Sequence, residues 1–312
     1  MSTFFSRIGL GTKLSLLTGT SVAVLFLVFT FLLSNKASQQ LETLAMEDLH
    51  NQSSGVQDMV EMFNSSLSEE VESYTRLFNS FLPQPVTSDP SQRREINGID
   101  VPLLKGGDSD LHENNATVDD FLTRTGAIAT LFVRSGDDFV RVATSLRKEN
   151  GDRAIGTRLD KASPAFAPVL KGEVYRGLAL LFGKRYITQY QPVKDASGNT
   201  IAILFVVVDI THSWEIMRGK ILGRQLGESG RFFVLDRNSG KNYGNYLFHP
   251  SEEGKRPQWN EADLNTVLQQ TTGTLELQNR DGHSQMLSWI TVPGWNWTGA
   301  GAVDKAVLPT YG

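Results

Sequence analysis

The sequence has 312 residues, no cysteine, 30 basic and 34 acidic side chains, and a formal net charge of −4. The lack of cysteine excludes a disulfide-stapled scaffold and a cysteine-ligated metal site. The small acidic excess, without any basic tract, argues against nucleic acid or an anionic lipid surface as the partner.

The first predicted element is an apolar helix near the N-terminus. Residues 14–33 contain no charged side chain, and at about 1.5 Å per residue a helix of this segment spans the roughly 30 Å hydrocarbon core of a bilayer. Arg7 and Lys13 precede it, and positive flanks favour the cytoplasmic side. We therefore expect residues 1–13 in the cytoplasm, a transmembrane helix over 14–34 and the rest of the chain outside. A cleaved signal peptide is the alternative, although its apolar core is usually only about 7–15 residues long.

A second, much longer helix is expected over residues 37–82. This stretch contains no proline and one glycine, and Pro83 ends it. Because its apolar residues recur in steps of three and four, they form one stripe that packs on its own domain, on a second copy of the chain, or on both. The stripe comprises Leu41, Ala45, Leu49, Val56, Val60, Phe63, Leu67, Val71, Tyr74, Phe78 and Phe81.

A first module is expected over residues 83–211. It begins with an irregular connection, 83–118, rich in Pro, Gly, Asp, Asn and Ser, and a short helix near 118–125. A hairpin, a short helix and three antiparallel strands follow, and the nearly all-apolar last strand is expected at the centre of the sheet. The hairpin strands are 129–134 and 139–146, the helix is 164–171, and the later strands are 174–181, 186–193 and 200–210.

The same order of elements recurs in residues 212–305, after a connecting helix over 212–226. A hairpin (231–236 and 245–250) and a helix (261–270) precede strands at 273–278, 284–291 and 295–303. This repetition predicts an α+β fold with two similar modules, each built on an antiparallel sheet of about five strands, along one long helix.

Motifs for catalysis or cofactor binding are weak throughout the chain. The five histidines have no metal-ligand spacing, and GESGR (227–231), DRNSGK (236–241) and GAGAV (299–303) are best interpreted as tight turns. We therefore expect a binding domain rather than an enzyme, with no metal and no cofactor.

The most suggestive polar residues lie on the strands of the first module. Tyr186, Thr188 and Tyr190 project to one face by the period of two. Strict alternation on 139–146 places Arg141 on one face and Thr144 on the other. An arginine fork among aromatic walls suits a small carboxylate or an amino acid, whereas an amine with Asp209 as counter-ion is the alternative.

The candidate ligand-binding residues are Phe132, Arg141, Thr144, Tyr175, Lys184, Tyr186, Thr188, Tyr190 and Asp209. A competing interpretation is that the tyrosines are ordinary amphipathic sheet residues with solvated hydroxyls and that Arg141 is a surface charge.

Residues 164–211 also carry a family resemblance. The pattern G-K-x-Y-x-T-x-Y-x-P-V at 183–193, the D-x-x-G turn at 195–198 and the apolar strand that ends in Asp209 resemble the core of extracytoplasmic Cache sensor domains. The layout over roughly residues 37–305 resembles the Cache 3/Cache 2 fusion (double PAS-like) region of bacterial methyl-accepting chemotaxis proteins. This resemblance implies a chemotaxis transducer in the inner membrane, a homodimer through the long helix, which binds a small molecule in the periplasm.

The same resemblance implies a cytoplasmic kinase complex as a partner, reached only through regions absent from this chain. The chain stops at Gly312, and residues 306–312 would lead into a second transmembrane helix, so we expect a fragment. Similar ectodomains belong to sensor histidine kinases and diguanylate cyclases. The alternatives to a chemotaxis transducer are therefore the ectodomain of a sensor histidine kinase or of a diguanylate cyclase, and a membrane-anchored partner-binding or structural protein.

Overall fold

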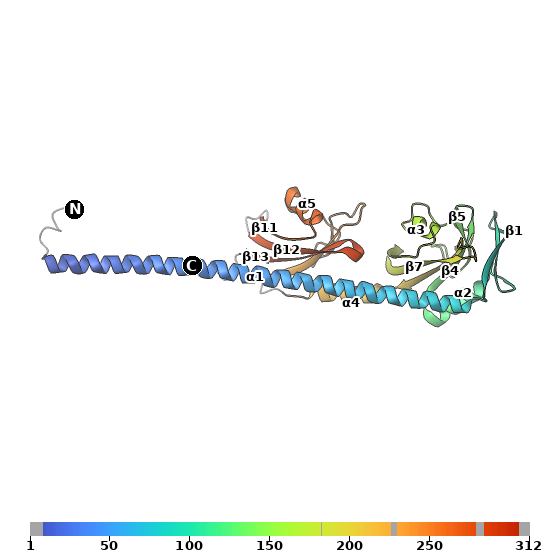
Figure 1. Cartoon of the computed structure of the whole chain (residues 1–312), viewed down its shortest axis with the longest axis horizontal. Helices are drawn as coiled ribbons and strands as arrows, with labels where there is room; N and C mark the ends of the chain where they lie inside the picture. The colour runs from blue at the N-terminus through green and yellow to red at the C-terminus, as the bar shows by residue number, and fades with distance from the viewer. Residues whose placement is uncertain (1–8, 182, 226–229, 279–283, 306–312) are drawn as a thin grey trace. The chain divides into compact units, whose positions relative to one another are not determined.

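The computed structural model describes residues 9–305 except 182, 226–229 and 279–283 (Figure 1). The chain divides into two compact units. Unit 1 combines Met1–Glu61 with Gly219–Gly312, and unit 2 is Met62–Arg218. Each unit contains one five-stranded antiparallel sheet, so the α+β fold with two sheet modules is confirmed.

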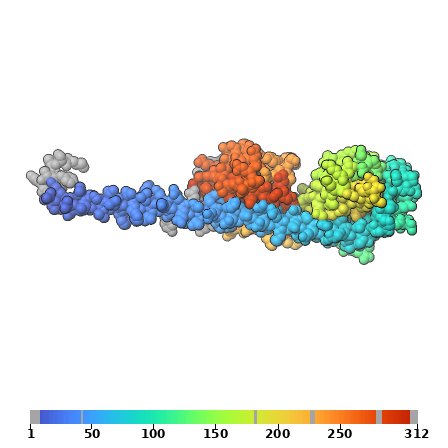
Figure 2. All heavy atoms as spheres, in the orientation of Figure 1, coloured from blue at the N-terminus to red at the C-terminus, as the bar shows by residue number. Residues whose placement is uncertain are grey.

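Helix α1 (Leu10–Phe81) joins the two helices expected from the sequence into one unbroken element. It ends immediately before Leu82 and Pro83, as the proline predicts. From Leu49 onward, one stripe of the helix is buried, whereas the large apolar side chains between Leu14 and Leu33 are exposed. In the view of Figure 2, no other segment that the structure describes covers that apolar stretch. By length and composition α1 is able to cross a membrane.

The unit 1 sheet has the strand order β10-β9-β13-β12-β11, and all its pairs are antiparallel. Helix α5 lies on one side of this sheet and α1 on the other (Figure 1). The approach of α1 is close because β13 carries glycine there: a Cβ on Gly301 would lie 2.7 Å from Leu49 Cδ1. The elements are β9 (Arg231–Asp236), β10 (Tyr246–Phe248), α5 (Glu261–Gln269), β11 (Thr272–Gln278), β12 (Ser284–Val292), the 3₁₀ turn η2 (Pro293–Trp295) and β13 (Trp297–Asp304).

The unit 2 sheet has the order β5-β4-β8-β7-β6, which is the topology of unit 1 in the same chain sequence. The predicted repeat is therefore confirmed. The apolar strand β8 is central and buried along almost its whole length, as expected. The elements are α2 (Asn115–Thr125), β4 (Ile128–Ser135), β5 (Asp138–Thr144), α3 (Phe166–Leu170), β6 (Tyr175–Leu181), β7 (Lys184–Lys194), β8 (Thr200–Asp209) and α4 (Thr211–Leu222).

The expectation of an irregular connection over 83–118 is wrong. The chain there forms a small antiparallel sheet of β1 (Val86–Ile96), β2 (Ile99–Gly106) and β3 (Ser109–Asp110). Asn97 and Gly98 both have positive φ and form the two-residue turn between β1 and β2. Most of β1 is exposed and polar, so apolar alternation is missing, but the Asn-Gly pair was a usable hairpin signal.

Candidate functional site

The register of the unit 2 sheet places all nine predicted site residues on one face. Tyr190 pairs with Tyr175 on one side and Phe205 on the other, and Tyr186 pairs with Asp209. Residues that are paired across antiparallel strands project to the same face, and so do alternate residues within one strand. The same logic connects Thr188 with Tyr186, Lys184 with Tyr186, Arg141 with Phe132, and Thr144 with Thr130.

Strand β5 departs from the strict alternation assumed from the sequence. Ala143 pairs with Leu131, but Arg141 pairs with the next residue, Phe132, so Val142 is an extra residue at a β-bulge. The bulge brings Arg141 and Thr144 onto the same face. The expectation that alternation separates these two side chains is therefore wrong, because a bulge is invisible to a pattern with a period of two.

A pocket of about 250 Å³ lies on this face. Four of the nine predicted residues line it, namely Arg141, Tyr175, Thr188 and Tyr190. The segment that follows β5 contributes further lining residues. The remaining lining residues are Leu146, Ser163, Pro164, Leu178, Ala179, Phe205 and Val207.

The half-buried Arg141 is the only arginine or lysine side chain in the pocket lining. Its Nη1 donates a hydrogen bond of 2.6 Å to Thr157 Oγ1, and its Cζ lies 4.7 Å from the centre of the Phe132 ring. Its Nε is buried without a hydrogen-bond partner, and among the described residues no carboxylate lies within 4.0 Å. Burial lowers the pKa of Arg141, and the neighbouring Tyr190 opposes this effect in part. The positive charge is therefore poorly compensated by the protein itself.

Two tyrosines form aromatic walls beside Arg141. Tyr190 stacks on Phe205 with ring centres 4.1 Å apart, and its ring centre lies 6.1 Å from that of Tyr175. Burial raises the pKa of Tyr190 to about 12, an effect that Arg141 partly opposes. The phenol thus stays neutral at physiological pH and is able to donate a hydrogen bond. Gly177 leaves room for the Tyr175 ring, since a Cβ there would lie 2.4 Å from the Tyr175 hydroxyl.

The other predicted residues lie outside the pocket lining. The guanidinium of Arg141 lies over the ring of Phe132, and the buried hydroxyl of Thr144 forms a hydrogen bond with that of Thr130. Tyr186 packs against the apolar cluster of the same face. Lys184 and Asp209 form an exposed ion pair with 3.5 Å between Nζ and Oδ2, so Asp209 is already engaged.

Sequence patterns did not identify the lining residues from the segment after β5, nor did they identify Thr157. Leu146, Ser163 and Pro164 come from a segment without a repeating pattern, so no periodic signal was available. Phe205 and Val207 were obtainable, because they belong to the predicted central strand and alternate toward the same face.

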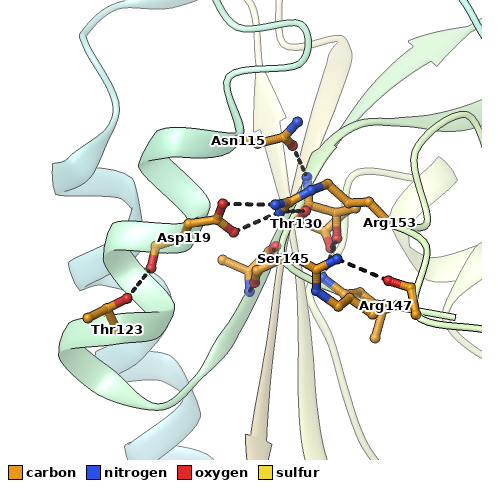
Figure 3. A network of polar contacts seen from close by, with 11 residues as sticks. Asn115, Asp119, Thr123, Thr130, Ser145, Arg147 and Arg153 are labelled. Carbon is orange, nitrogen blue, oxygen red and sulfur yellow. Dashed lines mark hydrogen bonds and ion pairs between the residues drawn. The ribbon is translucent and has the colours of Figure 1, made fainter. Parts of the chain in front are cut away.

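A polar network fixes the segment that follows β5 (Figure 3). Arg153 binds Asp119 of α2 through two hydrogen bonds of 2.7 and 2.9 Å, and it donates another of 2.7 Å to the carbonyl of Thr144. Asn115 Oδ1 accepts from the backbone N–H of Thr144 at 3.3 Å. The segment that contributes Leu146 to the pocket is thereby tied to α2. Phe121 of α2 in turn packs against Tyr74, Phe78 and Phe81 of α1.

The opposite face of the unit 2 sheet is connected to α1 directly. Arg176 lies between Tyr175 and Gly177 on β6, so it projects away from the pocket. Its Nη2 donates a hydrogen bond of 2.9 Å to Glu72 of α1. Strand β6 is therefore linked to α1 by Arg176, and the segment after β5 is linked to α1 through α2.

Comparison with known proteins agrees with the observed fold. The family model described as the Cache 3/Cache 2 fusion domain matches residues 34–306. No curated protein matches the chain. Among solved structures, the ligand-binding domain of Mlp24 with asparagine is 17% identical, with a TM-score of 0.51 over 87% of this chain and 96% of that one.

Two further structures share the fold. The ligand-binding domain of the Campylobacter jejuni chemoreceptor Tlp3 in complex with L-valine is 10% identical, with a TM-score of 0.51, and covers 87% of this chain and 97% of that one. The extracellular domain of the putative histidine kinase mmHK1S-Z2 is 12% identical, with a TM-score of 0.51, and covers 84% and 98%. At these identities the likeness concerns the fold.

Proposed function

The chain belongs to the Cache 3/Cache 2 fusion family, and on this premise we propose that it is the ligand-sensing region of a bacterial chemoreceptor. In this proposal the pocket of unit 2 binds a small carboxylate, and an amino acid in particular. The observation that carries the proposal is the guanidinium of Arg141, which lines the pocket without a carboxylate partner among the described residues. A ligand carboxylate supplies the missing anion and accepts from the arginine fork.

The dimensions of the pocket support a small ligand. Its volume of about 250 Å³ lies just below the usual range of roughly 300–1,000 Å³ for small-molecule sites. The apolar walls of Leu146, Phe205 and Val207 suit an aliphatic side chain, while Tyr190 and Thr188 supply hydroxyl groups. Mlp24 with asparagine and Tlp3 with L-valine are relatives in fold whose ligands have this size and a carboxylate.

The exposed apolar part of α1 supports a membrane anchor. A segment with large apolar side chains exposed from Leu14 to Leu33 is stable in lipid and costly in water. We place unit 2 and its pocket in the periplasm, because Lys13 precedes the segment on the cytoplasmic side. The homodimer through α1 and the coupling to a cytoplasmic kinase complex are parts of the same proposal. The ectodomain of a histidine kinase remains the second candidate, supported by the fold of mmHK1S-Z2.

The test is calorimetric titration of the full chain in lipid nanodiscs with L-valine, L-asparagine and isobutylamine. The proposal expects at least one amino acid to bind and isobutylamine, which lacks the carboxylate, to give no heat. Arg141→Gln should weaken binding roughly ten- to hundredfold, whereas Arg124→Gln, which removes an exposed arginine of α2 outside the pocket, should not. Binding of the amine alone, or amino-acid binding that is unchanged in Arg141→Gln, would contradict the proposed site.

A further inference from the structure

A second, larger pocket lies beside the first one. Its volume is about 530 Å³, and Arg141 and Leu146 line both pockets, so these two side chains form a shared wall. None of its other lining residues belongs to the predicted site. They are Arg147, Lys148, Glu149, Asn150, Ala154 and Thr157.

Most lining residues of this outer pocket belong to a short hairpin over residues 146–154, whose two arms are joined by backbone hydrogen bonds. The N–H of Ala154 donates to the carbonyl of Leu146 at 3.0 Å, and the N–H of Lys148 donates to the carbonyl of Asp152 at 2.8 Å. Arg147 and Arg153 form a β-bridge between the two arms. Because Arg153 is itself held by Asp119 and by the carbonyl of Thr144 (Figure 3), the hairpin has a defined place beside β5.

The charged groups around the outer pocket are mainly positive. Arg141, Arg147 and Lys148 line it, against the single carboxylate of Glu149. Arg147 donates to the backbone carbonyl of Gly151 at 3.0 Å, and its charge also helps to lower the pKa of Asp119 without forming an ion pair with it. Within the described part of the chain, neither Arg147 nor Lys148 has a carboxylate within 4.0 Å.

Two further carboxylates belong to neighbouring residues outside the lining. Asp119 is bound to Arg153, and Asp152 accepts a hydrogen bond of 2.8 Å from the neutral side chain of Asn150. The outer pocket therefore presents two cations and the carboxylate of Glu149 next to the guanidinium that the proposed function assigns to a ligand carboxylate.

We propose that the outer pocket is a second anion subsite, so that the pocket pair takes a dianionic ligand. One carboxylate binds Arg141 at the shared wall, and the second anionic group lies in the outer pocket beside Arg147 and Lys148. This inference rests on the proposed function and adds the ligand class to it: dicarboxylates, including acidic amino acids, bind more tightly than monocarboxylates of the same length. The apolar wall of Leu146 contacts the methylene chain between the two groups.

Calorimetric titration of the full chain in nanodiscs with matched pairs of acids tests the subsite. The pairs are butyrate with succinate, valerate with glutarate, and caproate with adipate, so that each pair differs in one carboxylate. At least one diacid should bind roughly tenfold more tightly than its monoacid partner, as charge-assisted hydrogen bonds to two cations allow. The preference should shrink as sodium chloride rises, because both cations are exposed.

The double variant Arg147→Gln/Lys148→Gln should lose the preference for the diacid and keep the affinity for the monoacid. The matched control is Arg93→Gln/Arg94→Gln, which removes two exposed cations from β1 and should keep the preference. Equal binding of diacids and monoacids, or a preference unchanged in the double variant, overturns the second subsite while the proposed function stands. If no acid, L-valine or L-asparagine binds the unmodified chain, the proposed function fails, and the second subsite fails with it.

Discussion

The two units contain sheets of the same strand order, yet among the described residues a packed apolar cluster covers one sheet, and the other sheet carries a pocket. In unit 1, the nine-residue α5 buries Leu264, Val267 and Leu268 against a cluster that includes Trp289. In unit 2, the five-residue α3 buries only Phe166 and Val169, and the pocket remains beside Arg141. The shared topology thus defines where a site is possible, and the side chains and covering segments decide whether one exists.

Two glycines sharpen this difference. Gly273 on β11 is paired with Trp289, whose indole occupies the space above it, and a Cβ there would lie 2.4 Å from Trp289 Cζ2. Gly177 on β6 makes the same kind of room for the Tyr175 ring, which lines the pocket. The first glycine serves close packing, and the second serves the shape of a binding site.

The largest expected effect is the loss of the tryptophan that fills unit 1. Trp289 is 1% exposed, so Trp289→Ala should lower the free energy of unfolding by about 3–5 kcal/mol. Urea denaturation followed by circular dichroism measures this loss. Amino-acid binding by calorimetry should persist at temperatures where the variant is folded. If Trp289→Ala lowered the free energy of unfolding by less than about 1 kcal/mol, the apolar cluster around Trp289 would not be tightly packed.

The next effect concerns the guanidinium of unit 2. Arg141→Gln should weaken binding of L-valine or L-asparagine by a factor that corresponds to about 1.5–3 kcal/mol, the usual contribution of hydrogen bonds to a charged group. The free energy of unfolding should stay unchanged or rise, because a half-buried cation without a carboxylate partner among the described residues is removed. Titration calorimetry and thermal melting measure the two quantities. A large loss of stability with intact amino-acid binding would contradict the assignment of Arg141 to the binding site.

A matched pair of alanine substitutions compares the two glycines directly. Gly273→Ala should cost about 1–3 kcal/mol of stability, since the enclosed indole of Trp289 has no space to move. Gly177→Ala should cost less, because the Tyr175 hydroxyl is the free end of a side chain beside a pocket. Its main effect should be weaker amino-acid binding, since the displaced ring narrows the pocket. Equal destabilisation by Gly273→Ala and Gly177→Ala would contradict the proposed difference between the two glycines.

The smallest expected effect is a pH dependence carried by the Asp119–Arg153 pair of unit 2. The hydrogen bonds from Arg153 lower the pKa of Asp119 below its ordinary value of 3.8. A carboxyl with a depressed folded-state pKa stabilises the fold above the unfolded-state value, and this contribution is lost as pH falls through the folded-state pKa.

The pair is partly exposed, so its contribution is about 1 kcal/mol or less. Asp119→Asn should remove that contribution at pH 7, and its difference from the unmodified chain should shrink as the pH falls below the ordinary value of 3.8. Thermal melts across this range measure the difference. A gap between the two proteins that stays constant with pH would show that the carboxylate charge is not involved.

The sequence analysis was most successful where a repeating pattern was long. The apolar stripe of α1, the repeated order of hairpin, helix and three strands, and the central position of β8 all follow from periodicity and are confirmed. It was wrong for residues 83–118, where an exposed hairpin carries few apolar residues and only the Asn97–Gly98 turn identifies it. The nine candidate site residues are on one face, and which of them bind a ligand stays a prediction.

The sequence alone determined the elements and their order, because the side-chain periods of helices and strands are local and repeat along the chain. It also determined the residue types available for a site: tyrosines, threonine and an arginine on neighbouring strands. Only the tertiary structure decided how they meet. The bulge at Val142 turned Thr144 to the face of Arg141, and the segment after β5 supplied part of the pocket lining. Both depend on register and on contacts between distant residues, which no local pattern encodes.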